Sequence, residues 1–124
     1  MKKIMEDLIK SKTGNPSKRV EYANSYYKEL EDPETALNIL EDMRLQFVQM
    51  EGMVKVRGFG KKSTTKASWN RWQKAYPEVV SSLVYIYRKN DQLMDAELVL
   101  SDWVDRNPSD KNAQKILEEI RSGG

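Results

Sequence analysis

Apolar residues recur at every third or fourth position along most of this chain. This spacing places them on one face of an α-helix, and the strict alternation that marks a half-buried β-strand is lacking. The pattern therefore predicts an all-α fold built from antiparallel helical hairpins, forming a single helical domain over residues 1–124.

The first hairpin is predicted over residues 17–50. Its first helix, over 17–31, carries apolar residues at helical spacing, namely Val20, Ala23, Tyr27 and Leu30. Asn15-Pro16-Ser17 offers a turn and a cap before this helix, and Asp32 followed by Pro33 does the same for the second helix. The apolar stripe of the second helix comprises Ala36, Leu37, Leu40, Met43, Phe47 and Met50.

A second hairpin is predicted over residues 77–108. Its apolar residues, the small residue that follows them and the closing proline are Val80, Leu83, Val84, Tyr87, Ala96, Leu100 and Pro108. This segment resembles one tetratricopeptide repeat (TPR), a helix–turn–helix unit of about 34 residues. Residues 17–50 resemble a second unit when Ala36 is aligned with Ala96. The resemblance implies hairpins that stack and offer a groove to a partner protein. Tyr87 and Trp103 lie on the apolar stripes of adjacent helices in this hairpin, and both are predicted to be core residues.

Residues 52–76 form an insertion between the two repeat-like units. Gly52, Gly58 and Gly60 predict a loop over 52–63. The serine and threonines at 63–65 predict a cap before an extra helix over 65–76, and Pro77 is then expected to begin the next helix.

The last predicted element is a capping helix over residues 109–121. Ser109 or Asp110 is expected to cap it, and its apolar stripe consists of Ala113, Ile116, Leu117 and Ile120. Repeat arrays commonly end with such a helix, because it shields the last apolar face from water.

Composition removes much of the common catalytic chemistry. The 124-residue chain contains no cysteine and no histidine, which excludes thiol nucleophiles, imidazole bases and the usual zinc ligands. We therefore expect no enzyme activity, no metal site and no other cofactor. No run of about 18 apolar residues occurs, and acids interrupt the N-terminal apolar stretch. Neither membrane insertion nor a signal peptide is expected, and a cytoplasmic location is predicted.

Basic residues are concentrated in the insertion. Between Glu51 and Glu78 the chain carries seven of them and no acid, namely Lys55, Arg57, Lys61, Lys62, Lys66, Arg71 and Lys74. Removing these seven from the chain's 21 basic residues leaves 14, against 19 acidic ones. This basic island favours an anionic partner, and its predicted anion-binding residues are Lys55, Arg57, Lys61, Lys62 and Lys66. The alternative is a solvated loop that keeps the protein in solution.

Aromatic residues lie within the same insertion. Trp69, Trp72 and Tyr76 fall at i, i+3 and i+7 of the predicted extra helix, hence on one of its faces. They would either pack the helix onto a repeat unit or offer a surface on which nucleic-acid bases stack.

The TPR resemblance also implies where a groove would lie, because the first helix of each pair lines the concave surface. The positions carried over by register are Lys18, Glu21, Tyr22, Ser25 and Lys28 in the first unit and Glu78, Ser81, Ser82, Tyr85 and Arg88 in the second. Tyr22 and Tyr85 are amphipathic and suit an interface, although packing between adjacent helices is the alternative for both.

These observations lead to two expected functions. The first is a non-catalytic scaffold that binds a protein or peptide, in particular an acidic one, through the repeat groove or the basic island. The second is an RNA-binding helical repeat that uses the basic, aromatic-containing insertion. Because at least about three repeats are generally needed for a stable stack, the chain is expected either to be a domain of a longer protein or to self-associate.

Overall fold

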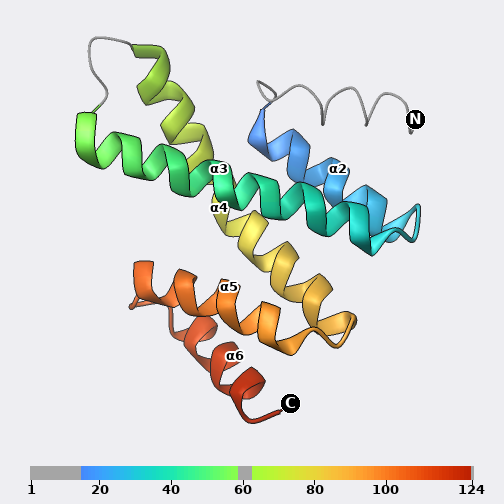
Figure 1. The fold of residues 1–124 in the computed structure, drawn as a ribbon. Helices are drawn as coiled ribbons and strands as arrows, with labels where there is room; N and C mark the ends of the chain where they lie inside the picture. The colour runs from blue at the N-terminus through green and yellow to red at the C-terminus, as the bar shows by residue number, and fades with distance from the viewer. Residues whose placement is uncertain (1–14, 59–62, 124) are drawn as a thin grey trace. The chain divides into compact units, whose positions relative to one another are not determined.

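The computed structural model describes residues 15–58 and 63–123 of the chain (Figure 1). Over these residues the fold is all-α and contains no strand, which confirms the predicted fold class. The helices, in chain order, are α2 (Pro16–Lys28), α3 (Pro33–Arg57), α4 (Ser63–Lys89), α5 (Leu93–Arg106) and α6 (Lys111–Arg121). The N-terminal segment and two predicted anion-binding residues, Lys61 and Lys62, lie outside the described residues.

The chain forms two compact units that divide between Val79 and Val80. Unit 1 contains α2, α3 and the first part of α4, and unit 2 contains the rest of α4, α5 and α6. None of the described helices has the length and the apolar composition that crossing a membrane requires.

The hairpin of unit 1 begins where its capping residues predict. The Asn15 side chain accepts a hydrogen bond from the Ser17 backbone N–H at 3.0 Å. Asp32 accepts one from the Thr35 N–H at 3.1 Å, so each helix starts with a satisfied N-cap and a proline at its first position. The first helix ends at Lys28 rather than at residue 31, and Leu30 consequently lies beyond the helix and is exposed.

The core of unit 1 is built by three helices. It comprises Val20, Ala23 and Tyr26 of α2, Ala36, Ile39, Leu40, Met43 and Phe47 of α3, and Trp69, Trp72, Ala75, Tyr76 and Val79 of α4. The Phe47 ring stacks on Tyr76 with centroids 3.8 Å apart and on Trp69 with centroids 5.2 Å apart. These contacts confirm the packing interpretation of the aromatic stripe and join α4 to α3.

Two boundary predictions in the insertion are wrong. Residues 52–57 are helical, because α3 continues through Gly52 and ends only at Arg57, where Gly58 follows as the C-cap with a φ of 66° that suits glycine. A glycine in a helix interior costs no more than about 1 kcal/mol, so Gly52 alone does not break the helix. Pro77 does not begin a helix either, since it lies inside the continuous α4.

The continuity of α4 through Pro77 has a packing reason. Proline in a helix interior removes one backbone hydrogen bond and costs about 3 kcal/mol. Tyr76 and Val79, on either side of it, are buried, and so is Leu83 one turn later. Burying such side chains contributes about 1.5–3 kcal/mol each, which offsets the cost of keeping Pro77 helical.

Unit 2 packs α5 against α6 beside the last turns of α4. Its core comprises Val80, Leu83, Val84, Ile86, Tyr87, Ala96, Val99, Leu100, Ala113, Leu117 and Ile120. Asp110 rather than Ser109 caps α6, accepting a hydrogen bond from the Ala113 N–H at 3.0 Å. Tyr87 is buried as predicted, but the prediction of a core Trp103 is wrong: this indole is partly exposed, and its N–H donates to Asp110 at 3.0 Å.

Candidate partner-binding surfaces

The groove positions predicted on α2 lie along one face of that helix. Lys18, Tyr22 and Ser25 follow one another at i, i+4 and i+7. Lys18 is exposed and pairs with Glu21 at 3.2 Å, whereas Tyr22 and Ser25 are half-buried and Lys28 is exposed in the last turn. This face therefore offers only part of its aromatic ring to a partner.

The groove positions predicted on α4 form a more exposed face in unit 2. The side chain of Tyr85 is 51% exposed, and the Lys89 ammonium lies 5.7 Å from the centre of its ring. Ser82 is half-buried one turn earlier, and Arg88 reaches Glu119 of α6 at 3.8 Å. Tyr85 is thus largely open to solvent, as an interface residue would be, and cations lie beside it.

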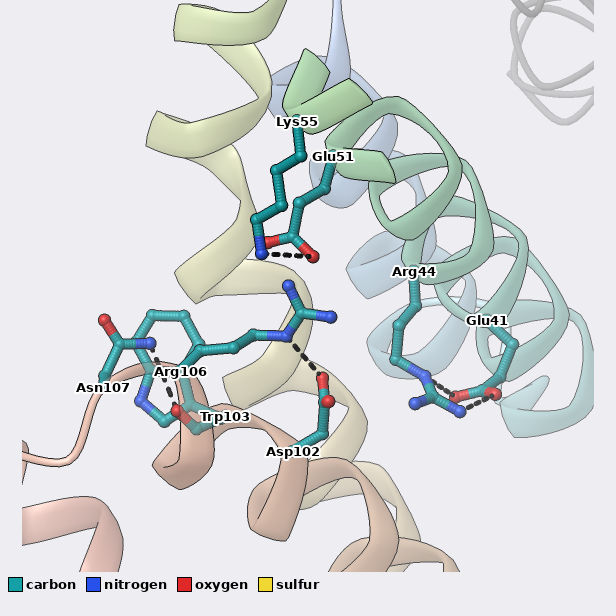
Figure 2. A network of polar contacts seen from close by, with 8 residues as sticks. All are labelled: Glu41, Arg44, Glu51, Lys55, Asp102, Trp103, Arg106 and Asn107. Atoms are coloured by element: carbon teal, nitrogen blue, oxygen red, sulfur yellow. Dashed lines mark hydrogen bonds and ion pairs between the residues drawn. The ribbon is translucent and has the colours of Figure 1, made fainter. Parts of the chain in front are cut away.

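The basic island is less uniform than its sequence indicates. The Lys55 ammonium lies 3.9 Å from the Glu51 carboxylate, one turn earlier on α3 (Figure 2). Lys55 therefore has an acid within reach although its own stretch contains none, because Glu51 stands just outside that stretch. Arg57 and Lys66 are both exposed and form no ion pair with a described residue.

Three cations of the island share the first half of α4. Lys66, Arg71 and Lys74 are exposed, and none of them forms an ion pair with a described residue. They point away from the buried stripe that contains Trp69 and Trp72. We call these three residues the α4 basic face. Lys66 stands in the first turn, where the helix dipole disfavours positive charge and where α4 has no acid, so the placement does not serve helix stability.

A further surface was missed by the sequence reasoning. Leu45, Val48 and Val56 are exposed on the side of α3 that faces away from its buried stripe, and we call these three residues with Gly52 the α3 outer face. The signal was present in the sequence as a second set of apolar residues at helical spacing. Assigning residues 52–63 to a loop cut this set in two and concealed it.

Two further ion pairs lie within single helices. Figure 2 shows Arg44 holding Glu41 through two hydrogen bonds of 3.1 and 3.0 Å, and Arg106 holding Asp102 at 2.9 Å. Each pair lies three or four residues apart on one helix, where such pairs contribute a few tenths of a kcal/mol. They stabilise helices.

The Asp110 carboxylate is held in its ionised form by the groups that it caps. The hydrogen bond from the Trp103 indole N–H lowers the pKa of this carboxyl below the usual value of an aspartate, and the Ala113 and Asn112 backbone N–H groups act in the same direction against the opposing effect of burial. This is the effect expected of an N-cap. Across residues 15–58 and 63–123, no three acidic side chains gather closely enough to hold a metal ion.

Comparisons with protein-family models, with curated proteins and with solved structures found no match to this chain. The proposals below therefore rest on the surfaces of the chain itself.

Proposed function

We propose that this chain is a non-catalytic, TPR-like interaction scaffold that binds an acidic segment of a partner protein at the α4 basic face. The observation that carries the proposal is the set of three exposed cations, Lys66, Arg71 and Lys74, that have no ion pair with a described residue. Seven other basic side chains of the described residues each hold a nearby carboxylate, namely Lys18, Arg19, Arg44, Lys55, Arg88, Arg106 and Arg121.

The spacing of these cations suits an extended acidic segment. Lys66 and Lys74 are eight residues apart on α4, which corresponds to about 12 Å along a helix. Alternate residues of an extended chain are about 6.6 Å apart and point the same way, so carboxylates four residues apart span a similar length. Complementary charges at this distance speed association and fix orientation more than they add affinity.

The RNA-binding alternative depended on two features, exposed basic residues and aromatic rings on which bases stack, and the second of these is not accessible. Single-stranded nucleic acid is commonly bound through aromatic rings on which bases stack, but Trp69, Trp72 and Tyr76 are buried. The basic face could still contact phosphates, yet base stacking at these rings would require α4 to leave the core. An acidic protein segment needs only the cations, and it is therefore the favoured partner.

The proposal is tested by titrating a labelled peptide of alternating glutamates, and separately a labelled single-stranded RNA, by fluorescence anisotropy. Wild type is compared with the variant Lys66→Ser/Arg71→Ser/Lys74→Ser. The matched control changes Lys111, Lys115 and Arg121 to serine. These three residues are also exposed, so the net charge changes equally.

The face variant should bind the peptide about tenfold more weakly, since three exposed charge contacts of about 0.5 kcal/mol each sum to roughly 1.5 kcal/mol. The control should lose less than about threefold, through long-range attraction alone. Equal peptide binding by the face variant and wild type would contradict the proposal. Tighter binding of RNA than of peptide, with a steep salt dependence, would favour the alternative.

A further inference from the structure

The helix α3 carries apolar side chains on two opposite faces. One face buries Ala36, Leu40 and Met43 in the core of unit 1, whereas Leu45 and Val56 on the other are 56% and 84% exposed. Leu45 and Val56 are eleven residues apart, which is close to three full turns, so their side chains point in nearly the same direction. Clustered apolar side chains on one face mark a surface that a partner covers, unlike apolar residues scattered singly.

A glycine at the middle of the α3 outer face supports the same conclusion. Gly52 lies two turns after Leu45 on the same side of the helix, and a Cβ built on it would meet nothing within 4 Å. It has no positive φ, so neither packing nor backbone conformation within the chain requires a glycine there. Glycine destabilises a helix interior relative to alanine, but it lets another backbone approach closely. The α3 outer face is thus suited to a second helix packed against it.

The charges beside this face indicate that the second helix is another copy of α3. Along one edge, Glu41, Arg44, Glu51 and Lys55 alternate in sign and flank Val48. Glu41 and Lys55 stand seven residues before and after Val48, and Arg44 and Glu51 stand four before and three after it. Reversing the order of these four residues places every acid opposite a base. The edge is therefore complementary to an antiparallel copy of itself, whereas a parallel copy in register would oppose like charges.

We propose that the α3 outer face is the interface of a homodimer in which two copies of α3 pack antiparallel about a two-fold axis near Val48. In this arrangement Val48 meets its counterpart at the axis, as isologous contacts require. Leu45, three residues before Val48, then lies over Gly52 of the second copy, four residues after it. The large side chain fills the space that the glycine leaves open.

The four charged residues change partners in this dimer. In the single chain Arg44 pairs with Glu41 at 3.0 Å and Lys55 lies 3.9 Å from Glu51 (Figure 2). Across the two-fold axis Glu41 faces Lys55 and Arg44 faces Glu51, so the intrahelical pairs join into a network between chains. One pair of helices buries less than the roughly 1,200 Å² of a standard interface, and the dimer should therefore form in the micromolar range. The proposal does not depend on the α4 basic face.

The first experiment is sedimentation equilibrium of the full chain from about 5 to about 500 µM, a range that covers micromolar dissociation constants. Wild type should change from monomer to dimer within it. A monomer at every concentration would overturn the proposal. Assembly beyond a dimer would overturn it too, since an isologous contact closes.

The second experiment maps the interface. Gly52→Gln should weaken dimerisation at least tenfold, because it fills the space that Leu45 of the other copy needs, while its circular dichroism stays at least as helical as that of wild type. The matched control is Met94→Gln/Leu98→Gln, which changes two exposed apolar residues of α5. If the control abolished the dimer and Gly52→Gln did not, the interface would lie on unit 2 and the proposal would be wrong.

The third experiment tests the antiparallel orientation. Glu41→Lys and Lys55→Glu each create like-charge contacts across the axis, and each should weaken the dimer. The double variant Glu41→Lys/Lys55→Glu restores opposite charges and should return to within about threefold of wild type. A 1:1 mixture of the two single variants should likewise form a heterodimer. A double variant no tighter than the singles would overturn the antiparallel pairing.

Discussion

At the ion pair of Arg19 we predict that substituting one partner destabilises the fold more than substituting the other. The Arg19 side chain is only 2% exposed although it carries a charge, because it lies on α2 in the core of unit 1. It donates to Asp42 Oδ2 at 3.1 Å and to Gln46 Oε1 at 3.0 Å, and its Cζ lies 6.0 Å from the centre of the Trp72 ring. The Arg19 Nε makes no hydrogen bond to a described residue. Among the described residues, the buried cation therefore has Asp42 as its single charged partner.

Asp42, the partner of Arg19 in this ion pair, is much more accessible to solvent, because its side chain is 48% exposed. Asp42→Asn leaves the buried guanidinium without a counter-charge. Breaking a fully buried pair in this way costs about 3–5 kcal/mol, and an exposed pair contributes less than about 1 kcal/mol. For this half-exposed pair we expect a loss of about 2–3 kcal/mol.

Arg19→Met removes the cation together with its desolvation penalty and keeps an unbranched side chain against Trp72. Asp42 and Gln46 can then be hydrated, so the loss should stay below about 1.5 kcal/mol. Adding Arg19→Met to Asp42→Asn should recover most of the stability that Asp42→Asn lost. The free energies of unfolding in urea, followed by tryptophan fluorescence, give the coupling energy as a double-mutant cycle.

The control for this cycle is Glu41→Gln, which removes one carboxylate from the partly exposed Arg44 pair and should cost less than about 1 kcal/mol. If Asp42→Asn cost as little as this control while Arg19→Met cost more, the reasoning would be refuted. Arg19 would then stabilise the fold by packing on Trp72 and not through its charge.

Three other substitutions test separate parts of the fold. Pro77→Ala should raise the free energy of unfolding by about 2 kcal/mol, because a backbone N–H becomes available inside α4; an unchanged or lower value would show that the proline is accommodated without cost. Trp103→Phe should raise the pKa of Asp110, measured by NMR titration of its carboxyl carbon. Because the folded-state pKa is depressed, the stability that this hydrogen bond contributes is present above the unfolded pKa and is lost as the pH falls through the folded pKa; a difference between variant and wild type that persisted unchanged in acid would contradict this linkage. Phe47→Ala should cost about 3–5 kcal/mol in urea unfolding, since it removes the ring on which two aromatics of α4 stack, and a loss below about 1 kcal/mol would show that this stack does not hold unit 1 together.

The caps show which features can be predicted from sequence. Asn15, Asp32 and Asp110 each accept a hydrogen bond from a backbone N–H two or three residues later. Such contacts form as soon as the local backbone turns, so residue type and spacing are sufficient to identify them. The same holds for the aromatic stripe of α4, because spacing along a helix places Trp69, Trp72 and Tyr76 on one face whatever packs against it.

The candidate surfaces were predictable only in part. The exposed cations Lys66 and Arg57 could be named from charge alone, but pairing of Lys55 with Glu51 depends on residues 51–55 being helical. The α3 outer face could not be recognised while Gly52 was assigned to a loop. Whether an apolar residue such as Val56 is buried or exposed depends on which side of its helix the neighbouring helices cover.

The sequence by itself determined the helical class, the positions of the caps and the faces on which apolar residues gather, because each depends on contacts within about one turn. Tertiary structure decided the rest. Gly52 and Pro77 disfavour a helix locally by about 1 and about 3 kcal/mol. The helix α4 runs through Pro77 because burial of side chains on both sides contributes more, whereas α3 continues past Gly52 because the cost there is small. The burial of Arg19 was settled in the same way, because Asp42 and Gln46 of α3 and Trp72 of α4 lie beside its guanidinium and no local pattern specifies them.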